Sequence, residues 1–289
     1  MHKVLLVLLF LTCALGCAIW AADAPPAKDT PELPKTKINP KDGAEMVLIP
    51  AGEFLMGTSE DEITSWLKAY PDDKHHGFTD ELPQRKVDLD AFYMYKNDVT
   101  VAQYRKFCAA TKRDMPPEPS WKWQKTHPIV NVTWDDAKAY ADWAGTTLPT
   151  EAQWEKAARG DDGRPFPWGF TWDATKCNNA VSDNDYRNYL GKTSPVGSFP
   201  AGASPYGCLD MAGNVLQWCA DWYDEGYYQK APTRNPTGPA IGTGRVLRGG
   251  NWTDFTPRRF RAAVRNYHSP LFRSYSILGF RCAVCSPGP

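Results

Sequence analysis

The chain has 289 residues, and 33 lysine and arginine residues balance 33 aspartate and glutamate residues. This zero formal net charge argues against a nucleic-acid-binding protein, because affinity for phosphate needs an excess of clustered cations. Hydrophobic residues make up 42% of the chain and 12 residues are Trp, which excludes wholesale disorder and permits a large core. The 22 Gly and 25 Pro favour a loop-rich α+β domain over a helical bundle.

The amino terminus is typical of a targeting segment. The apolar run of residues 4–15 follows Lys3 and is too short to span a bilayer as a stable helix. We expect a signal peptide over residues 1–22 and an exported protein, either periplasmic or secreted. Cleavage before Cys17 would leave a lipid anchor, the only membrane contact expected, whereas cleavage near Ala22 would leave a soluble protein.

A linker is expected after the signal peptide. Residues 23–42 contain five prolines and several charges but few large apolar side chains, so they cannot bury enough surface to order themselves. We therefore predict one folded domain over residues 43–285, followed by a short tail over residues 286–289.

The sequence of the domain predicts short strands and three helices joined by long irregular connections. Residues 46–52 form an apolar strand pattern, and residues 86–94 partly alternate as in one half-buried strand. Three helix starts share a Thr capping residue and a Gln or Asp side chain three residues later, at Thr100/Gln103, Thr133/Asp136 and Thr150/Gln153. The aromatic residues that follow are interpreted as core. Connections as long as those of the final third need something to hold them in place.

Six cysteines follow the signal peptide, at positions 108, 177, 208, 219, 282 and 285. In an oxidising compartment they permit disulfides, whose pairing the sequence does not specify. The single Cys282-x-x-Cys285 motif lacks a second Cys or His pair, so a structural interpretation is favoured over metal binding.

Seven ordered motifs lie between residues 44 and 283. They are MVLIPAGEFLMG (46–57), DAFY (90–93), LPTEAQWE (148–155), PVGSF (195–199), DMAGNV (210–215), RGG (248–250) and GFRC (279–282). In this order they resemble the formylglycine-generating-enzyme, or sulfatase-modifying-factor, family. The resemblance implies a C-type-lectin-like α+β fold with small antiparallel sheets, few short helices and much irregular chain.

The resemblance also implies calcium between the long loops. One implied site takes its ligands from Asn178, the carbonyl of Asn179, Asn188 and the carbonyl of Leu190. The other takes them from Asp210, the carbonyls of Gly213 and Val215, and Gln217. Oxygen ligands of these types suit calcium. The alternative is that these side chains only hydrogen-bond the loop backbone.

Formylglycine-generating enzymes resemble one another in carrying two cysteines shortly after the Gly-Gly motif, where they bind copper(I) and the substrate thiol. Soft thiolate ligands select Cu(I). Here no cysteine occurs between Cys219 and Cys282. Asp254 falls at the first thiol position, and the second falls within residues 256–258. We therefore expect no copper, no copper-dependent oxidation and no catalytic residue of that kind. An oxidative maturation enzyme of the same family that uses another metal centre is the alternative.

The segment over residues 251–277 is rich in aromatic, Ser, Asn and Arg residues, which recognition surfaces favour. It predicts a face that binds a peptide or protein. The candidate residues are Asn251, Trp252, Asp254, Arg258, Arg261, Arg265, Tyr267, His268 and Tyr275. The arginines suggest an acidic or sulfated partner; a row of arginines bound to the framework is the alternative. A further alternative is a ligand-binding face diversified by retroelements, as in related lectin-fold proteins.

Overall fold

The computed structural model describes residues 33–181, 190–273 and 276–285. The expected signal peptide with Cys17, the predicted ligands Asn188 and Tyr275, and the tail over residues 286–289 lie outside the described residues. Within the described part, no helix is both long and apolar enough to cross a membrane.

The described strands are β1 (Thr36–Ile38), β2 (Glu45–Ile49), β3 (Gly52–Met56), β4 (Arg85–Leu89), β5 (Phe92–Tyr95), β6 (Leu216–Trp222), β7 (Arg245–Arg248), β8 (Asn266–His268), β9 (Leu278–Gly279) and β10 (Ala283–Cys285). The α-helices are α1 (Glu60–Ala69), α2 (Val101–Thr111), α3 (Trp134–Trp143), α4 (Glu151–Arg159) and α5 (Tyr227–Lys230). Short 3-10 turns include η1 (His75–Glu81), η2 (Ala174–Lys176), η4 (Pro200–Gly202) and η5 (Pro257–Phe260).

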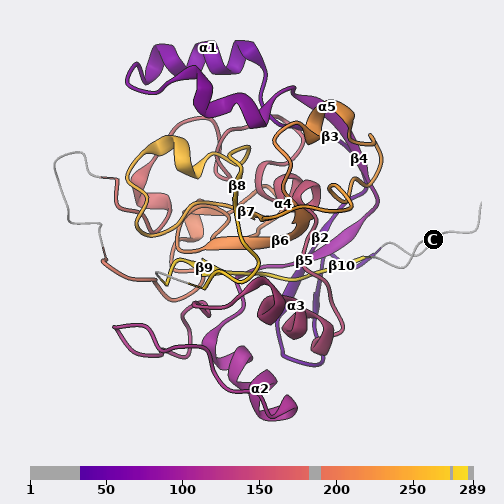
Figure 1. The fold of residues 1–289 in the computed structure, drawn as a ribbon, viewed down its shortest axis with the longest axis vertical. Coiled ribbons are helices and arrows are strands. Elements are labelled where there is room, and N and C mark those ends of the chain that lie inside the picture. The colour runs from indigo at the N-terminus through magenta and orange to yellow at the C-terminus, as the bar shows by residue number, and fades with distance from the viewer. Residues whose placement is uncertain (1–32, 182–189, 274–275, 286–289) are drawn as a thin grey trace, which may run out of the picture. The chain divides into compact units, whose positions relative to one another are not determined.

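The strands form three small sheets. The first has the order β1-β2-β5-β10 and is antiparallel, and the second is the hairpin-like pair β3-β4. The third has the order β8-β7-β6-β9, in which only the β6-β9 pair is parallel. Figure 1 shows β6, β7 and β8 in the middle of the described fold, with α1 at one end and α2 at the other.

The three predicted helix starts are confirmed as the caps of α2, α3 and α4. In each helix the Thr side chain accepts a hydrogen bond from the third helical amide, and the Gln or Asp side chain accepts one from the cap amide. The sequence interpretation missed α1, which begins with the same device at Ser59 and Glu62. A capping box satisfies two of the amides that a helix start leaves free.

Two predicted boundaries are wrong. Residues 36–38 of the expected linker form β1 and pair with β2 in antiparallel register, and the neighbouring Asp42 is 2% exposed. The strand expected over residues 86–94 is two strands in different sheets. Only β4 alternates, whereas all four residues of β5 are buried, with Tyr93 and Tyr95 in one apolar cluster and Phe92 and Met94 in another. A strand that is covered on both faces reads as a continuous apolar run.

Two large apolar clusters fill the interior. One gathers the aromatic faces of α2 and α3, where the rings of Tyr104 and Tyr140 stack at 5.7 Å, around Phe280. The other surrounds the fully buried Trp154 of α4. Because eight of the nine residues of α4 are buried, its charged side chains must find partners inside the protein.

Candidate functional site

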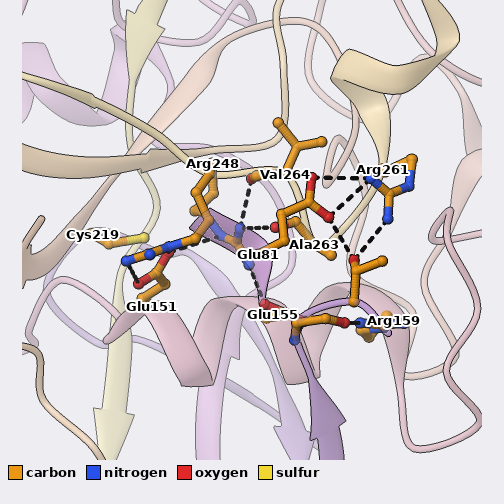
Figure 2. Close-up of polar contacts among 12 residues, drawn as sticks. Glu81, Glu151, Glu155, Arg159, Cys219, Arg248, Arg261, Ala263 and Val264 are labelled. Atoms are coloured by element: carbon orange, nitrogen blue, oxygen red, sulfur yellow. Dashed lines mark hydrogen bonds and ion pairs between the residues drawn. The ribbon is translucent and has the colours of Figure 1, made fainter. Parts of the chain in front are cut away.

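The buried charges of α4 meet the RGG motif. Glu155 is fully buried; its Oε1 accepts hydrogen bonds from the Gly57 amide at 2.8 Å and from Arg159 Nη1 at 2.9 Å. Its Oε2 pairs with Arg248 Nη2. Arg248 also donates to the carbonyls of Ala263 and Val264, at 2.8 and 2.6 Å (Figure 2). Two family motifs are thus joined by one ion pair in the core.

A second carboxylate of α4 extends this network. Arg265 Nε and Nη2 donate to the two oxygens of Glu151 at 2.8 and 3.0 Å. Burial alone would raise the pKa of Glu151, but the guanidinium groups of Arg265 and Arg248 hold that pKa below its usual value. The Glu151 amide donates to Asp221 Oδ2 at 2.9 Å, and burial raises the pKa of Asp221 to about 8.

Arg261 makes a third buried pair. Its Nη1 contacts both oxygens of Glu81, at 3.0 and 2.9 Å, and its Nη2 donates to Thr58 Oγ1 at 2.8 Å. Figure 2 shows this group beside the Arg248 network. Because Arg261 and Arg265 are satisfied inside the protein, they cannot serve as surface ligands for an acidic partner.

The predicted ligand-binding face is therefore not assembled as expected. Arg258 donates to the Gly77 carbonyl at 2.8 Å, and so also belongs to the framework. Tyr267 is 55% exposed and stacks on Tyr223, whereas His268 stacks on Phe272. The structure fits the alternative interpretation, in which these arginines are bound to the framework. Arg258, Arg261 and Arg265 are therefore not available to bind an acidic or sulfated partner.

The position at which the family resemblance implies the first thiol, Asp254, lies in a loop that hydrogen bonds close. Asp254 Oδ2 accepts hydrogen bonds from the backbone amide and the side-chain amide of Asn251, at 2.9 and 2.8 Å. The Asp254 carbonyl accepts from the Ala180 amide at 2.9 Å, and burial raises the pKa of the Asp254 carboxyl. Trp252 is 9% exposed and packs edge-on against Trp121. These contacts fix the loop that carries Asp254.

The cysteines of the described residues are all free. Five are buried, and burial raises the pKa of the thiols of Cys177, Cys219 and Cys282 above the usual value and that of Cys208 to about 11. A thiol with a raised pKa is a poor nucleophile at neutral pH. In the C-x-x-C motif, Cys282 is buried and Cys285 is exposed.

The first implied calcium site retains a free oxygen. Asn178 is 1% exposed, and its Oδ1 has no hydrogen-bond partner among the described residues. The Asn214 amide donates to the Asn178 carbonyl at 2.9 Å, so the two loops expected to hold calcium are in contact. Asn179 Oδ1 accepts from the Val181 amide, as a purely structural residue would, and Leu190 is 47% exposed. An unpaired buried amide oxygen fits a cation ligand.

The second implied calcium site does not fit. Gln217 Oε1 accepts hydrogen bonds from Trp154 Nε1 and Arg281 Nε, both at 2.7 Å, so both of its lone pairs are used. Gln217 Nε2 donates to the Asp210 carbonyl, and Asp210 Oδ2 accepts from the Gly197 amide. Arg281 thus takes the Gln217 oxygen that calcium would need. Gly213 and Val215 lie on the same buried loop, and the amide of Gly213 donates to the Gly249 carbonyl.

A cavity of about 500 Å³ opens between α1 and the loop over residues 163–172. We call it the aromatic pocket; its lining includes Trp66, Tyr70, Phe166, Phe170 and Trp172. The rings of Trp66 and Tyr70 stack with centroids 4.3 Å apart, and Phe170 is 66% exposed. Concave aromatic sites of this size are typical of ligand-binding sites.

The aromatic pocket adjoins η5, which begins at the position where the family resemblance implies the second thiol. Phe260, the last residue of η5, stacks on Trp172 at 5.0 Å, and Arg261 lines the pocket. Of the predicted ligand-binding residues that the structure describes, only Arg261 lines the pocket. The sequence analysis missed the remaining residues of the pocket lining, because most of them lie in or next to α1 and on a loop far away in the sequence. Trp66 and Tyr70 lie four residues apart after a capping box, and this spacing is the signal that could have indicated the pocket.

Comparisons with known proteins agree on one family. Residues 31–285 match the sulfatase-modifying factor enzyme 1-like domain. The chain is 33% identical to the formylglycine-generating enzyme of Streptomyces coelicolor, over 91% of this chain and 96% of that protein.

Solved structures share the fold. The structure of PvdO from Pseudomonas aeruginosa is 29% identical and superposes with a TM-score of 0.71 over 87% of this chain and 98% of PvdO. Treponema denticola variable protein 1 is 21% identical, with a TM-score of 0.66 over 87% of this chain and 99% of that protein, a likeness of fold alone. The predicted α+β fold with small sheets, few helices and much irregular chain is confirmed.

Proposed function

Because the chain belongs to the sulfatase-modifying factor enzyme 1-like family, we propose that it is a member that binds a peptide or protein ligand and does not oxidise a substrate thiol with copper. One observation carries the proposal: the aromatic pocket lies beside a segment that has no thiol. Asp254, where the family resemblance implies the first thiol, is held by Asn251. Residues 256–258, where it implies the second, lie at the start of η5, which packs on the pocket wall through Phe260.

The chemistry of this region supports binding over oxidation. A carboxylate that already accepts two hydrogen bonds cannot replace a soft thiolate as a Cu(I) ligand. The pocket, in contrast, offers rigid aromatic side chains, which contribute large contact areas at low entropic cost. Most of its lining is carried by α1 and the 163–172 loop.

Peptide display on the purified protein tests this proposal. Peptides selected on the wild-type protein should lose most of their binding to a Phe170→Ala variant, because that exposed ring lines the pocket. A Leu271→Ala variant is the matched control, since Leu271 is 73% exposed and does not line the pocket. Selected peptides that bind all three proteins equally would place recognition elsewhere, and a failure to select any peptide would count against the proposed function.

We also propose that calcium stabilises the loop at Asn178. The support is the buried, unpartnered Oδ1 of Asn178 and its contact with the loop of Asn214. When bound there, calcium would supply positive charge that holds the two loops together. The targeting segment at the amino terminus supports export, to the periplasm or the medium, as part of the same proposal.

A further inference from the structure

The walls of the aromatic pocket suit the aliphatic part of a long side chain. Trp66 and Tyr70 form one stacked wall on α1, and Phe170 with Trp172 lies on the opposite loop. Phe166 joins the two walls, with its ring centroid 6.0 Å from that of Trp66 and 5.4 Å from that of Trp172. Such a surface binds methylene groups by apolar burial.

The two arginines in the lining are both engaged in buried ion pairs. Arg159 is 2% exposed and pairs with Glu155 at 2.9 Å, and its Nη2 donates to the Gly163 carbonyl. Arg261 is 4% exposed and pairs with Glu81 at 2.9 Å. Neither guanidinium therefore offers a free charge to an anionic ligand.

The remaining charge at the pocket is negative. Asp61 is exposed, lines the pocket and has no ion-pair or hydrogen-bond partner among the described residues. Glu62, the other acidic residue in the lining, accepts hydrogen bonds from the Ser59 amide and from Gln84 Nε2. The pocket thus combines aromatic walls with one carboxylate available to a ligand.

From this combination we propose that the pocket takes a lysine or arginine side chain of a peptide ligand. The aliphatic stem packs between Tyr70 and Phe170, and the cationic head reaches the carboxylate of Asp61. A cation within about 6 Å of an aromatic centroid is attracted by the ring, and a long basic side chain keeps its head at the carboxylate while its stem is buried. The inference rests on the proposed function and specifies the chemistry of its ligand, which is opposite in charge to the partner that the arginine-rich segment suggested.

Isothermal titration with three capped heptapeptides tests the inference. They share the frame Gly-Ser-Gly-X-Gly-Ser-Gly, in which X is lysine, norleucine or glutamate. Norleucine keeps a similar aliphatic stem and removes the charge. The protein variants are Asp61→Asn, which keeps the shape of the side chain, and Asp72→Asn, an exposed control outside the pocket lining. Circular dichroism verifies that each variant is folded.

The lysine peptide should bind at least about fivefold more tightly than the norleucine peptide, and the glutamate peptide should bind most weakly. Asp61→Asn should weaken the lysine peptide about fivefold and leave the norleucine peptide unchanged, whereas Asp72→Asn should change neither. Equal binding of the lysine and norleucine peptides, both lost in Phe170→Ala, would overturn the inference and leave the proposed function standing. No binding of the lysine peptide, or binding insensitive to Asp61→Asn, would also overturn it.

Discussion

The carboxylate of Asp254 accepts two hydrogen bonds from a single residue, Asn251, through its backbone amide at 2.9 Å and its side-chain amide at 2.8 Å. This pairing closes the loop after the Gly-Gly motif, at the position where the family resemblance implies a catalytic thiol. Asp254 therefore has a structural role in this chain, as the acceptor for both amides of Asn251, that a cysteine side chain would not fill.

Replacing Asp254 by Ala should lower the free energy of unfolding by about 1–3 kcal/mol, because it leaves the buried amides of Asn251 without an acceptor. Urea unfolding measures the change. The Asp72→Ala variant, at an exposed position, should remain within about 0.5 kcal/mol of the wild type. An Asp254→Ala variant of wild-type stability would show that the loop does not depend on this contact.

The buried pairs of α4 should be costly to break. Glu155→Gln removes the carboxylate that pairs with Arg159 and one of the two carboxylates that face Arg248, the other being Glu151, so the free energy of unfolding should fall by about 3–5 kcal/mol. The exposed pair of Lys138 and Asp142 supplies the comparison, since Asp142→Asn should cost less than about 1 kcal/mol. Similar losses in the two variants would contradict a central role for the α4 network.

Stability should depend on pH through Asp221. Burial, with a further contribution from the Glu151 carboxylate, raises its pKa to about 8 in the folded protein, against an unfolded value of about 3.9. The folded protein therefore binds the Asp221 proton more tightly than the unfolded chain does. The contribution of this proton to the free energy of unfolding is lost as the pH rises from about 4 through 8. The nearby guanidiniums of Arg265 and Arg248 act in the opposite direction.

Asp221→Asn mimics the protonated side chain and can still accept from the Glu151 amide. The free energy of unfolding, measured by denaturant titration between pH 5 and 7, should fall more steeply in the wild type than in this variant, by at most about 1.4 kcal/mol per pH unit. Parallel pH profiles would show that Asp221 does not titrate in this range.

Chelation should reveal calcium at the loop of Asn178. Removal of calcium should lower the melting temperature of the wild type, and added calcium should restore it. Asn178→Ala should abolish this response because it removes the unpartnered oxygen. Asn179→Ala is the control: it loses side-chain hydrogen bonds but keeps the backbone carbonyl that the site would use, so its response should remain. A calcium response that survives Asn178→Ala would place the ion elsewhere.

Local features of the fold could be predicted from the sequence, because the residues that determine them are neighbours. The capping boxes of α2, α3 and α4 each depend on two residues three positions apart. The same reasoning would have found α1, whose capping box begins at Ser59. The single strand expected over residues 86–94 was wrong because only tertiary context divides it between two sheets.

The site was harder to predict because its contacts join distant segments. Arg265 and Glu151 are 114 residues apart, and Arg261 and Glu81 are 180 apart. An arginine-rich segment is interpreted as a basic surface when the buried carboxylates that pair with its arginines are unknown. Gln217 shows the same effect. Its side-chain oxygen was expected to bind calcium but accepts hydrogen bonds from Trp154 and Arg281. Long-range pairing, not residue type, decides these roles.

The most direct test of the central claim is a measurement of bound copper and oxygen consumption. The purified protein is loaded with copper(I), passed over a desalting column and incubated with a cysteine-containing sulfatase peptide and a reductant, with an active formylglycine-generating enzyme as the positive control. We predict that the protein retains no stoichiometric copper and consumes oxygen no faster than a protein-free control, because no cysteine lies between Cys219 and Cys282 and the described thiols are mostly buried. One equivalent of retained copper together with peptide-dependent oxygen consumption would contradict the account.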